Sequence, residues 1–254
     1  MQKWIRIFLI CITAVLLYST AFASQIQGIV ELLSVLPFDS SVFLQGLECI
    51  DENRLLVSGG LYNTSSIGIW NIKHNAWEKQ LPLPPAYFAE GLTQTPYGIW
   101  QFTWQENTAF LRDSTTLQSK KQVAFQGEGW GLAYVPESDV LISSDGSSSL
   151  IVRSAEDFTE IRRFDIGTQN INELEYAEGY LYANIWQSNR ILKIDLQKQR
   201  VVKEYDMQPI LESLDLTEQQ RCQMDVLNGI AHIKGNLFYI GGKLYPVMMK
   251  VNLH

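Results

Sequence analysis

The chain has 254 residues, of which 46% are hydrophobic, and its formal net charge is −7. This length and hydrophobic content are enough for one domain with a sizeable core, and no Pro-rich, Ser-rich or low-complexity tract divides the sequence. Because an acidic protein is repelled by nucleic acid and by anionic membranes, the charge argues against both as partners.

The first 23 residues have the pattern of a secretory signal peptide. Lys3 and Arg6 precede an apolar run over residues 7–18, and Ala-Phe-Ala at 21–23 supplies small residues before Ser24. The run is short for a membrane span, and an uncleaved anchor is the alternative interpretation. We predict an exported protein, periplasmic or secreted, without stable membrane association after cleavage. Without Lys3 and Arg6 the balance is 18 basic to 27 acidic residues, a net charge of −9.

A short motif recurs five times in the remaining chain, residues 24–254. Each copy has a polar or aromatic residue first, usually a glycine second, and an aliphatic residue third, and successive copies are about 40 to 56 residues apart. A repeat of this period with short strands between the copies is typical of a β-propeller. We therefore predict an all-β fold, a five-bladed propeller with one copy at the start of each innermost strand. The copies begin at Gln45, Glu90, Trp130, Asn172 and Asn228.

The register of the motif determines which of its side chains face the central channel. Side chains alternate along a strand, so the first and third residues of a regular copy would face the same side. We predict a bend at the second residue, which lets the first side chain face the central channel while the aliphatic residue packs between blades. The five leading residues would then converge on one axis, and Glu90 is the only acid among them. The alternative is that these residues only hydrogen-bond to neighbouring loops.

The other predicted elements follow in chain order. Residues 28–36 are apolar and β-prone, and we expect them to add to the last blade beside residues 248–253, which would lock the two chain ends together. Further strand candidates occur in pairs between the motif copies. They are residues 54–58 and 67–72, 97–104 and 108–112, 140–144 and 149–153, 180–186 and 191–195, and 236–241.

The long interval before the fifth copy contains a predicted helical insertion. Residues 209–214 and 216–221 have apolar positions at helical spacing, and Thr217 is suited to begin a second helix. We expect this insertion over one mouth of the channel, where it either covers the channel or shapes a pocket.

Two cysteines, Cys49 and Cys222, lie outside the signal segment. They belong to the first and last repeats, which are neighbours in a closed ring. A disulfide across that seam and two reduced thiols are both compatible with the sequence.

Few kinds of catalysis fit the available residues. The histidines are His74, His232 and His254, and none begins a motif copy, so a catalytic zinc centre is not expected. A structural divalent cation held in the channel by carbonyls remains compatible with the sequence. There is no Gly-x-Ser-x-Gly nucleophile motif and no phosphate loop.

A carboxylate surrounded by indole rings is poorly solvated, so the pKa of Glu90 should rise and suit it to proton transfer. Packing between blades is the alternative role of each tryptophan.

Ten short motifs run in order across nearly all of the exported chain. They are Phe-Leu-Gln-Gly-Leu-Glu (43–48), Gly-Leu-Tyr (60–62), Phe-Ala-Glu-Gly-Leu-Thr (88–93), Gln-Phe-Thr-Trp (101–104), Glu-Gly-Trp-Gly-Leu (128–132), Ser-Asp-Gly-Ser (144–147), Asn-Glu-Leu-Glu-Tyr (172–176), Ala-Asn-Ile-Trp (183–186), Val-Leu-Asn-Gly-Ile-Ala (226–231) and Gly-Lys-Leu-Tyr-Pro (242–246). Together they resemble the plant and bacterial type of glutaminyl-peptide cyclotransferase, although any one of them alone would be weak.

The resemblance implies a five-bladed propeller with acyltransferase activity. Such an enzyme converts the N-terminal glutamine of a peptide or protein to pyroglutamate and releases ammonia, with no catalytic metal and no required cofactor. The resemblance also implies that Glu90 is the catalytic acid and base, and we expect a monomer. The residues implied to line the substrate site are Phe43, Gln45, Trp104, Trp130, Asn172, Trp186 and Lys243.

Three positions depart from the family pattern. Tyr245 stands where the family usually has Trp, Leu44 where it has Thr, and Asp225 where it has Asn. Tyr245 puts the pocket shape or the substrate preference in question. The alternative functions are a non-catalytic exported propeller that binds a peptide, and a metal-dependent lactonase or related hydrolase on the same fold. Glu90 together with an amide and a lysine favours the cyclase over both.

Overall fold

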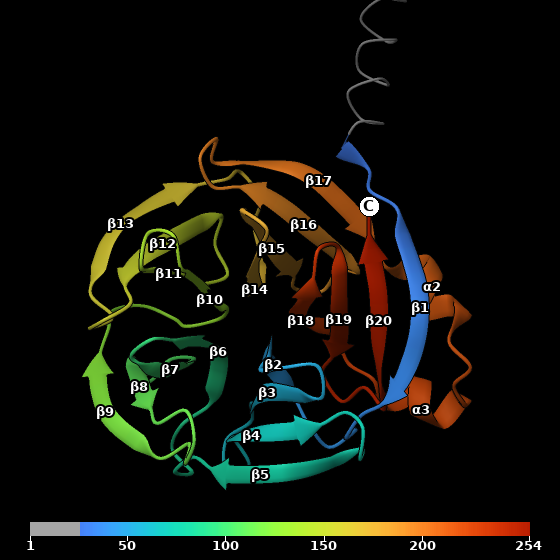
Figure 1. Cartoon of the computed structure of the whole chain (residues 1–254), viewed down its shortest axis with the longest axis horizontal. Coiled ribbons are helices and arrows are strands. Elements are labelled where there is room, and N and C mark those ends of the chain that lie inside the picture. The colour runs from blue at the N-terminus through green and yellow to red at the C-terminus, as the bar shows by residue number, and fades with distance from the viewer. Residues whose placement is uncertain (1–25) are drawn as a thin grey trace, which may run out of the picture.

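Residues 26–254 are described in this computed structural model, and their strands form five four-stranded antiparallel sheets arranged in a ring (Figure 1). Each sheet is one blade, and in four of the five blades the first strand along the chain lies nearest the channel. The predicted five-bladed β-propeller is therefore confirmed. No helix among these residues is long and apolar enough to cross a membrane. The predicted signal peptide, residues 1–23, lies outside the described residues.

Four blades each use four consecutive strands, ordered from the channel outward. Blade 1 consists of β2 (Leu44–Cys49), β3 (Arg54–Gly59), β4 (Ser66–Asn71) and β5 (Ala76–Pro82). Blade 2 consists of β6 (Ala89–Thr95), β7 (Gly98–Thr103), β8 (Thr108–Arg112) and β9 (Ser119–Ala124). Blade 3 consists of β10 (Leu132–Val135), β11 (Val140–Ser144), β12 (Ser149–Ser154) and β13 (Glu160–Asp165). Blade 4 consists of β14 (Ile171–Ala177), β15 (Tyr180–Ile185), β16 (Arg190–Asp195) and β17 (Arg200–Asp206).

Blade 5 joins the two ends of the described chain. Its strands are β18 (Leu227–Lys234), β19 (Leu237–Gly242), β20 (Val247–Leu253) and, outermost, β1 (Val30–Pro37). β1 runs antiparallel to β20, with Val30 opposite Leu253 and Pro37 opposite Val247. The predicted closure of the ring by the N-terminal strand is confirmed. The predicted strands between the motif copies are also present, with small differences at their ends.

The core lies between neighbouring blades. Leu56 and Ile67 of blade 1, for example, pack in one buried cluster with Leu92 and Ile99 of blade 2. The inner strands are buried on both faces because each blade is covered by two neighbours, whereas the outer strand β9 is almost entirely exposed.

The second residue of the repeated motif lies where neighbouring inner strands come closest. A Cβ atom on Gly91 would lie 2.7 Å from the backbone nitrogen of Leu132, and one on Gly131 would lie 2.1 Å from the carbonyl oxygen of Asn172. Only glycine leaves room for this approach. The ladder is irregular at the motif in four inner strands, between Leu44 and Gly46 in β2 and at the equivalent positions of β6, β14 and β18. These irregularities confirm the predicted bend.

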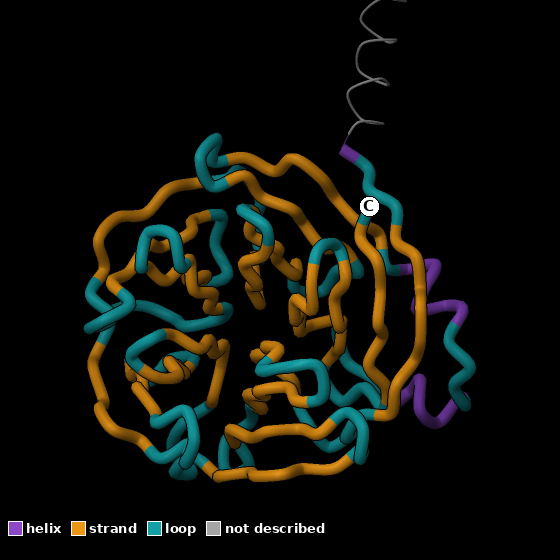
Figure 2. The backbone as a smooth tube through the Cα atoms, in the orientation of Figure 1, coloured by secondary structure: helices purple, strands orange, loops and turns teal. Residues whose placement is uncertain are grey.

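The helical insertion before the last blade consists of α2 (Gln208–Ser213) and α3 (Glu218–Gln223). Thr217 begins α3 as predicted, in a capping box with Gln220. The expected place of the insertion over the channel mouth is wrong: Figure 2 shows both helices outside the ring, beside blade 5. The physical reason is that Leu211 and Leu214 are buried in the core cluster that blades 4 and 5 share.

The two cysteines are both free thiols. Cys49 ends the inner strand β2, whereas Cys222 is exposed on α3 at the periphery. The ring is closed by the pairing of β1 with β20 and not by a disulfide at this seam.

Candidate active site

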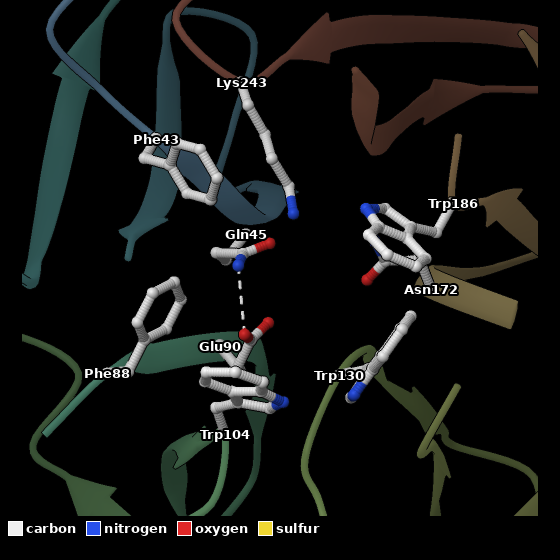
Figure 3. A pocket seen from close by; sticks show the side chains of 9 residues that line it. All are labelled: Phe43, Gln45, Phe88, Glu90, Trp104, Trp130, Asn172, Trp186 and Lys243. Carbon is white, nitrogen blue, oxygen red and sulfur yellow. Dashed lines mark hydrogen bonds between the residues drawn. The ribbon is translucent and has the colours of Figure 1, made fainter. Parts of the chain in front are cut away.

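A pocket of about 240 Å³ opens at one end of the channel (Figure 3). It contains all eight residues that the sequence singled out, and Phe88 in addition. The lining residues are Phe43, Gln45, Phe88, Glu90, Trp104, Trp130, Asn172, Trp186 and Lys243.

Strand direction explains why these residues meet. Each innermost strand begins, and the antiparallel second strand ends, at the same end of the ring. Gln45 and Glu90 therefore lie near the starts of β2 and β6, while Trp104, Trp186 and Lys243 directly follow β7, β15 and β19. These residues are far apart in the sequence, but they lie at the same end of their blades.

Asn228 is the one leading motif residue that does not line the pocket, and it was not among the residues predicted to line the substrate site. Its side-chain Nδ2 donates hydrogen bonds to the carbonyl oxygen of Leu44, at 3.0 Å, and to Oε1 of Gln45, at 3.3 Å. Asn228 therefore supports Gln45 without lining the pocket itself. The amide of Gln45 is held with its nitrogen toward Glu90, because its oxygen already accepts from Asn228.

Glu90 is 5% exposed, and its Oε1 accepts a 3.0 Å hydrogen bond from Nε2 of Gln45. Burial raises the pKa of Glu90 well above its usual range, as the sequence predicted. The positive charge of Lys243 opposes this rise, whereas the negative charges of Glu106 and Glu128 add to it. A carboxyl group with a raised pKa can exchange a proton near neutral pH.

Lys243 is also only 5% exposed. Its ammonium lies 4.7 Å from the centroid of the Phe43 ring, a cation–π contact. Burial lowers the pKa of Lys243, while the charges of Glu90 and Asp225 raise it. Among the described residues the ammonium makes no hydrogen bond and no ion pair within 4.0 Å, so its donors are available to a ligand.

The Asn172 side chain is similarly available. Asn172 is 2% exposed, and its amide points into the pocket in Figure 3. Its backbone carbonyl accepts a hydrogen bond from Ser144 Oγ at 2.7 Å, but its side-chain amide bonds to no other described residue. The pocket thus presents a carboxyl, an ammonium and an amide to whatever enters it.

Aromatic rings form the remaining walls in two groups. Phe88 packs edge-to-face against Phe43 at 6.1 Å and against Trp104 at 5.5 Å between ring centroids. Trp130 packs edge-to-face against Trp186 at 5.6 Å on the other side. Rings in this arrangement hold one another in place and exclude water from a small bound group.

Sequence reasoning assigned no site role to three residues that contribute here. Phe88 belongs to one of the ten motifs, and its side chain lines the pocket. Glu106 accepts hydrogen bonds from the Tyr62 hydroxyl and the Phe88 backbone nitrogen. Glu128 accepts hydrogen bonds from the indole nitrogens of Trp104 and Trp130. The only signal for Glu128 was its place two residues before Trp130.

Within residues 26–254 no three or more His, Cys, Asp or Glu side chains come together in a way that could hold a metal ion.

Comparison with known proteins gives a consistent family. The family model described as glutamine cyclotransferase matches residues 7–253. The chain is 31% identical over 232 residues to a glutaminyl-peptide cyclotransferase of Arabidopsis thaliana, which covers 88% of this chain and 71% of that protein. The crystal structure of Myxococcus xanthus glutaminyl cyclase superposes with a TM-score of 0.79 at 28% identity, over 90% of this chain and 97% of that one. Since the match spans nearly the whole sequence and the same fold, the chain belongs to the glutamine cyclotransferase family.

Proposed function

We propose that this protein is a glutaminyl-peptide cyclotransferase that converts the N-terminal glutamine of peptides or proteins to pyroglutamate and releases ammonia. One observation supports this most directly: the carboxyl of Glu90, the ammonium of Lys243 and the amide of Asn172 share one aromatic-walled pocket. Family membership supports the same reaction.

The reaction is intramolecular. The substrate's neutral α-amine attacks its own γ-carboxamide carbon, so a carbon–nitrogen bond to the α-nitrogen forms and the bond to the carboxamide nitrogen breaks. Holding the folded side chain in the attacking conformation removes much of the entropic barrier. The Trp130–Trp186 pair on one side and the Phe88–Trp104 pair on the other would enclose the side chain in that conformation.

Glu90 moves the proton in this proposal. Its carboxylate accepts a proton from the attacking α-nitrogen and donates it to the departing carboxamide nitrogen, which leaves as ammonia. Glu90 ends each cycle in its starting state, and the hydrogen bond from Gln45 holds one of its oxygens in place throughout. Proton transfer of this kind contributes about 10² to 10⁴ in rate.

Lys243 and Asn172 stabilise the negative charge that develops on the carboxamide oxygen. Both present donors with no other described partner, and both side chains are almost fully buried. Donors already in position at such a site stabilise the transition state more than they would in water. No step of this mechanism requires a catalytic metal, and we propose that none is used.

The proposed activity is tested by ammonia release from a short peptide that begins with glutamine, with and without a chelator. We expect chelator-insensitive release in the wild type and loss of turnover in Glu90→Gln, which retains the fold. The matched control is Glu156→Gln, an exposed residue in the β12–β13 loop. Retained turnover in Glu90→Gln would remove the proton-transfer role, and inactivation by the chelator would favour a metal-dependent hydrolase. No release from any glutamine-first peptide would favour a peptide-binding propeller.

We further propose that residues 1–23 direct export to the periplasm or outside the cell, and that the mature protein is a monomer without membrane association. The pattern of Lys3, Arg6 and the following apolar run supports this. Mass spectrometry of the protein from its native host tests the cleavage site, and a mass that includes residue 1 would contradict it. Light scattering of the mature protein tests the monomer.

A further inference from the structure

We propose that Glu128 is a positioning residue of this pocket, whose carboxylate fixes the indoles of Trp104 and Trp130 as two walls of the site. The kinetic consequences rest on the proposed cyclotransferase function. The clamp itself is a property of the fold and can be measured without any activity.

The geometry centres on one oxygen atom. Oε2 of Glu128 accepts hydrogen bonds from Nε1 of Trp104 at 2.8 Å and from Nε1 of Trp130 at 3.0 Å. The other carboxylate oxygen accepts from Nε2 of Gln105 at 3.0 Å. Trp104 follows β7 of blade 2 and Trp130 precedes β10 of blade 3, so a single carboxylate joins pocket walls from two blades.

The backbone beside Glu128 is adapted to this contact. The nitrogen of Gly129 donates a 2.9 Å hydrogen bond to the carbonyl oxygen of Trp104. A Cβ atom on Gly129 would lie 2.5 Å from the carbonyl oxygen of Thr103, so a larger residue would push the Glu128 loop away from the end of β7. The approach that brings Glu128 to both indoles therefore depends on this glycine.

The clamp reaches both aromatic groups of the pocket. Trp104 packs against Phe88 and Trp130 packs against Trp186, each edge-to-face. Fixing the two indoles consequently fixes the cleft between them, where the glutamine side chain would lie. Without the clamp each indole would be held by ring packing alone, since neither indole nitrogen bonds to any other described residue.

The charge of Glu128 adds a second, separable effect. Partial burial raises the pKa of Glu128, but the hydrogen bonds from Trp130, Gln105 and Trp104 outweigh burial and lower it below the usual range, so the group stays ionised. The charged groups that act on Glu90 are Lys243, Glu106 and Glu128. Since the negative charge of Glu128 raises the pKa of Glu90, neutralising Glu128 should lower that pKa.

Three variants separate these effects. Glu128→Leu removes both the acceptor and the charge, whereas Glu128→Gln removes the charge and keeps one oxygen acceptor. Asp39→Asn is the matched control, because Oδ2 of Asp39 accepts a 2.8 Å hydrogen bond from the indole of Trp77, outside the pocket.

The first readout is the set of indole N–H resonances in protein labelled with ¹⁵N-tryptophan, assigned by single Trp→Phe variants. In Glu128→Leu we expect the Trp104 and Trp130 resonances to move upfield while that of Trp77 stays. In Asp39→Asn we expect the Trp104 and Trp130 resonances to stay, with any change confined to that of Trp77. A general loss of folding would move all of them, which distinguishes it from loss of the clamp.

The second readout is the kinetics of ammonia release from a glutamine-first peptide. Misplaced walls should reduce kcat/KM of Glu128→Leu by about 10- to 100-fold, and Glu128→Gln should recover part of this loss. The acidic limb of the Glu128→Gln profile should move to lower pH, a shift that a purely structural defect would not produce. Asp39→Asn should keep the wild-type profile.

Unchanged Trp104 and Trp130 resonances in Glu128→Leu would overturn the proposal. So would moved resonances with wild-type kinetics, or an equal kinetic loss in Asp39→Asn. If the wild type releases no ammonia, the proposed function fails by itself, and the resonances still decide whether Glu128 clamps the indoles.

Discussion

Nε2 of Gln45 donates a 3.0 Å hydrogen bond to Oε1 of Glu90, and the two residues lead equivalent motif copies in neighbouring blades. This contact places an amide donor on one oxygen of the buried carboxyl and leaves the other oxygen facing the pocket (Figure 3). The repeated motif thus provides both the reactive carboxyl group and the group that orients it.

The contact between Gln45 and Glu90 should influence the pH dependence of activity. Gln45→Glu would place a second carboxylate beside Glu90, and a like charge disfavours ionisation of its neighbour. The pKa of Glu90, already raised by burial, should rise further. Because the proposed base is the ionised form, the acidic limb of the kcat/KM profile should move to higher pH. A limb that stays in place, while Gln45→Met remains active, would show that Glu90 does not set it.

Removing the ammonium of Lys243 should lower turnover. Removing a single donor to a developing oxyanion typically lowers kcat by about 10² to 10³. We expect Lys243→Met to show this loss in kcat with a smaller change in KM, measured by ammonia release under saturating peptide. A change in KM alone would indicate that Lys243 binds the ground-state substrate and does not stabilise the transition state.

Replacing a glycine between the inner strands of two blades should lower the stability of the fold. Gly131→Ala would place a methyl group 2.1 Å from the carbonyl oxygen of Asn172, so the inner strands of blades 3 and 4 would have to separate. We expect a loss of about 1 to 3 kcal/mol in the free energy of unfolding, as overpacking of a core costs.

Urea unfolding measures this loss, and Gly59→Ala is its control. The nearest atom to a Cβ on Gly59 is 3.4 Å away, in the flexible side chain of Val42. Equal stability of the two alanine variants would contradict the close-approach explanation.

The buried carboxyl group of Glu173 should make the stability of the protein depend on pH. It occupies the glycine position of the fourth motif copy, is 1% exposed, and accepts hydrogen bonds from the backbone nitrogens of Ile230 and Leu47. Burial, then the charge of Glu175, raises the pKa of Glu173 well above its usual range, although the two backbone hydrogen bonds oppose the rise.

A carboxyl group whose pKa is raised by folding stabilises the protein fully below its unfolded pKa, and this contribution is lost as pH rises through the folded pKa. The free energy of unfolding should therefore fall as pH increases over that interval, measured by urea unfolding at a series of pH values. Glu173→Gln should show a shallower fall, whereas Glu156→Gln should match the wild type. An unchanged slope in Glu173→Gln would mean that its pKa is the same in both states.

The sequence by itself determined the blade architecture and most of the pocket. Five motif copies in phase define five inner strands, and four of the five copies have glycine at the second position, where neighbouring inner strands approach each other. The N-terminal strand was predictable because β1 and β20 are both apolar segments left over at the two ends of a closed repeat. Pocket residues such as Glu90 and Trp186 were identified through the motifs that resemble the family.

Tertiary structure decided what depends on side-chain direction and on packing between distant segments. Asn228 supports Gln45 instead of lining the pocket, because the side-chain direction at that bend is not encoded in the repeat period. The helices α2 and α3 lie outside the ring because Leu211 finds its core partners between blades 4 and 5. Glu128 was not assigned a site role because a hydrogen bond to two indoles from different blades exists only after the ring has brought those blades together.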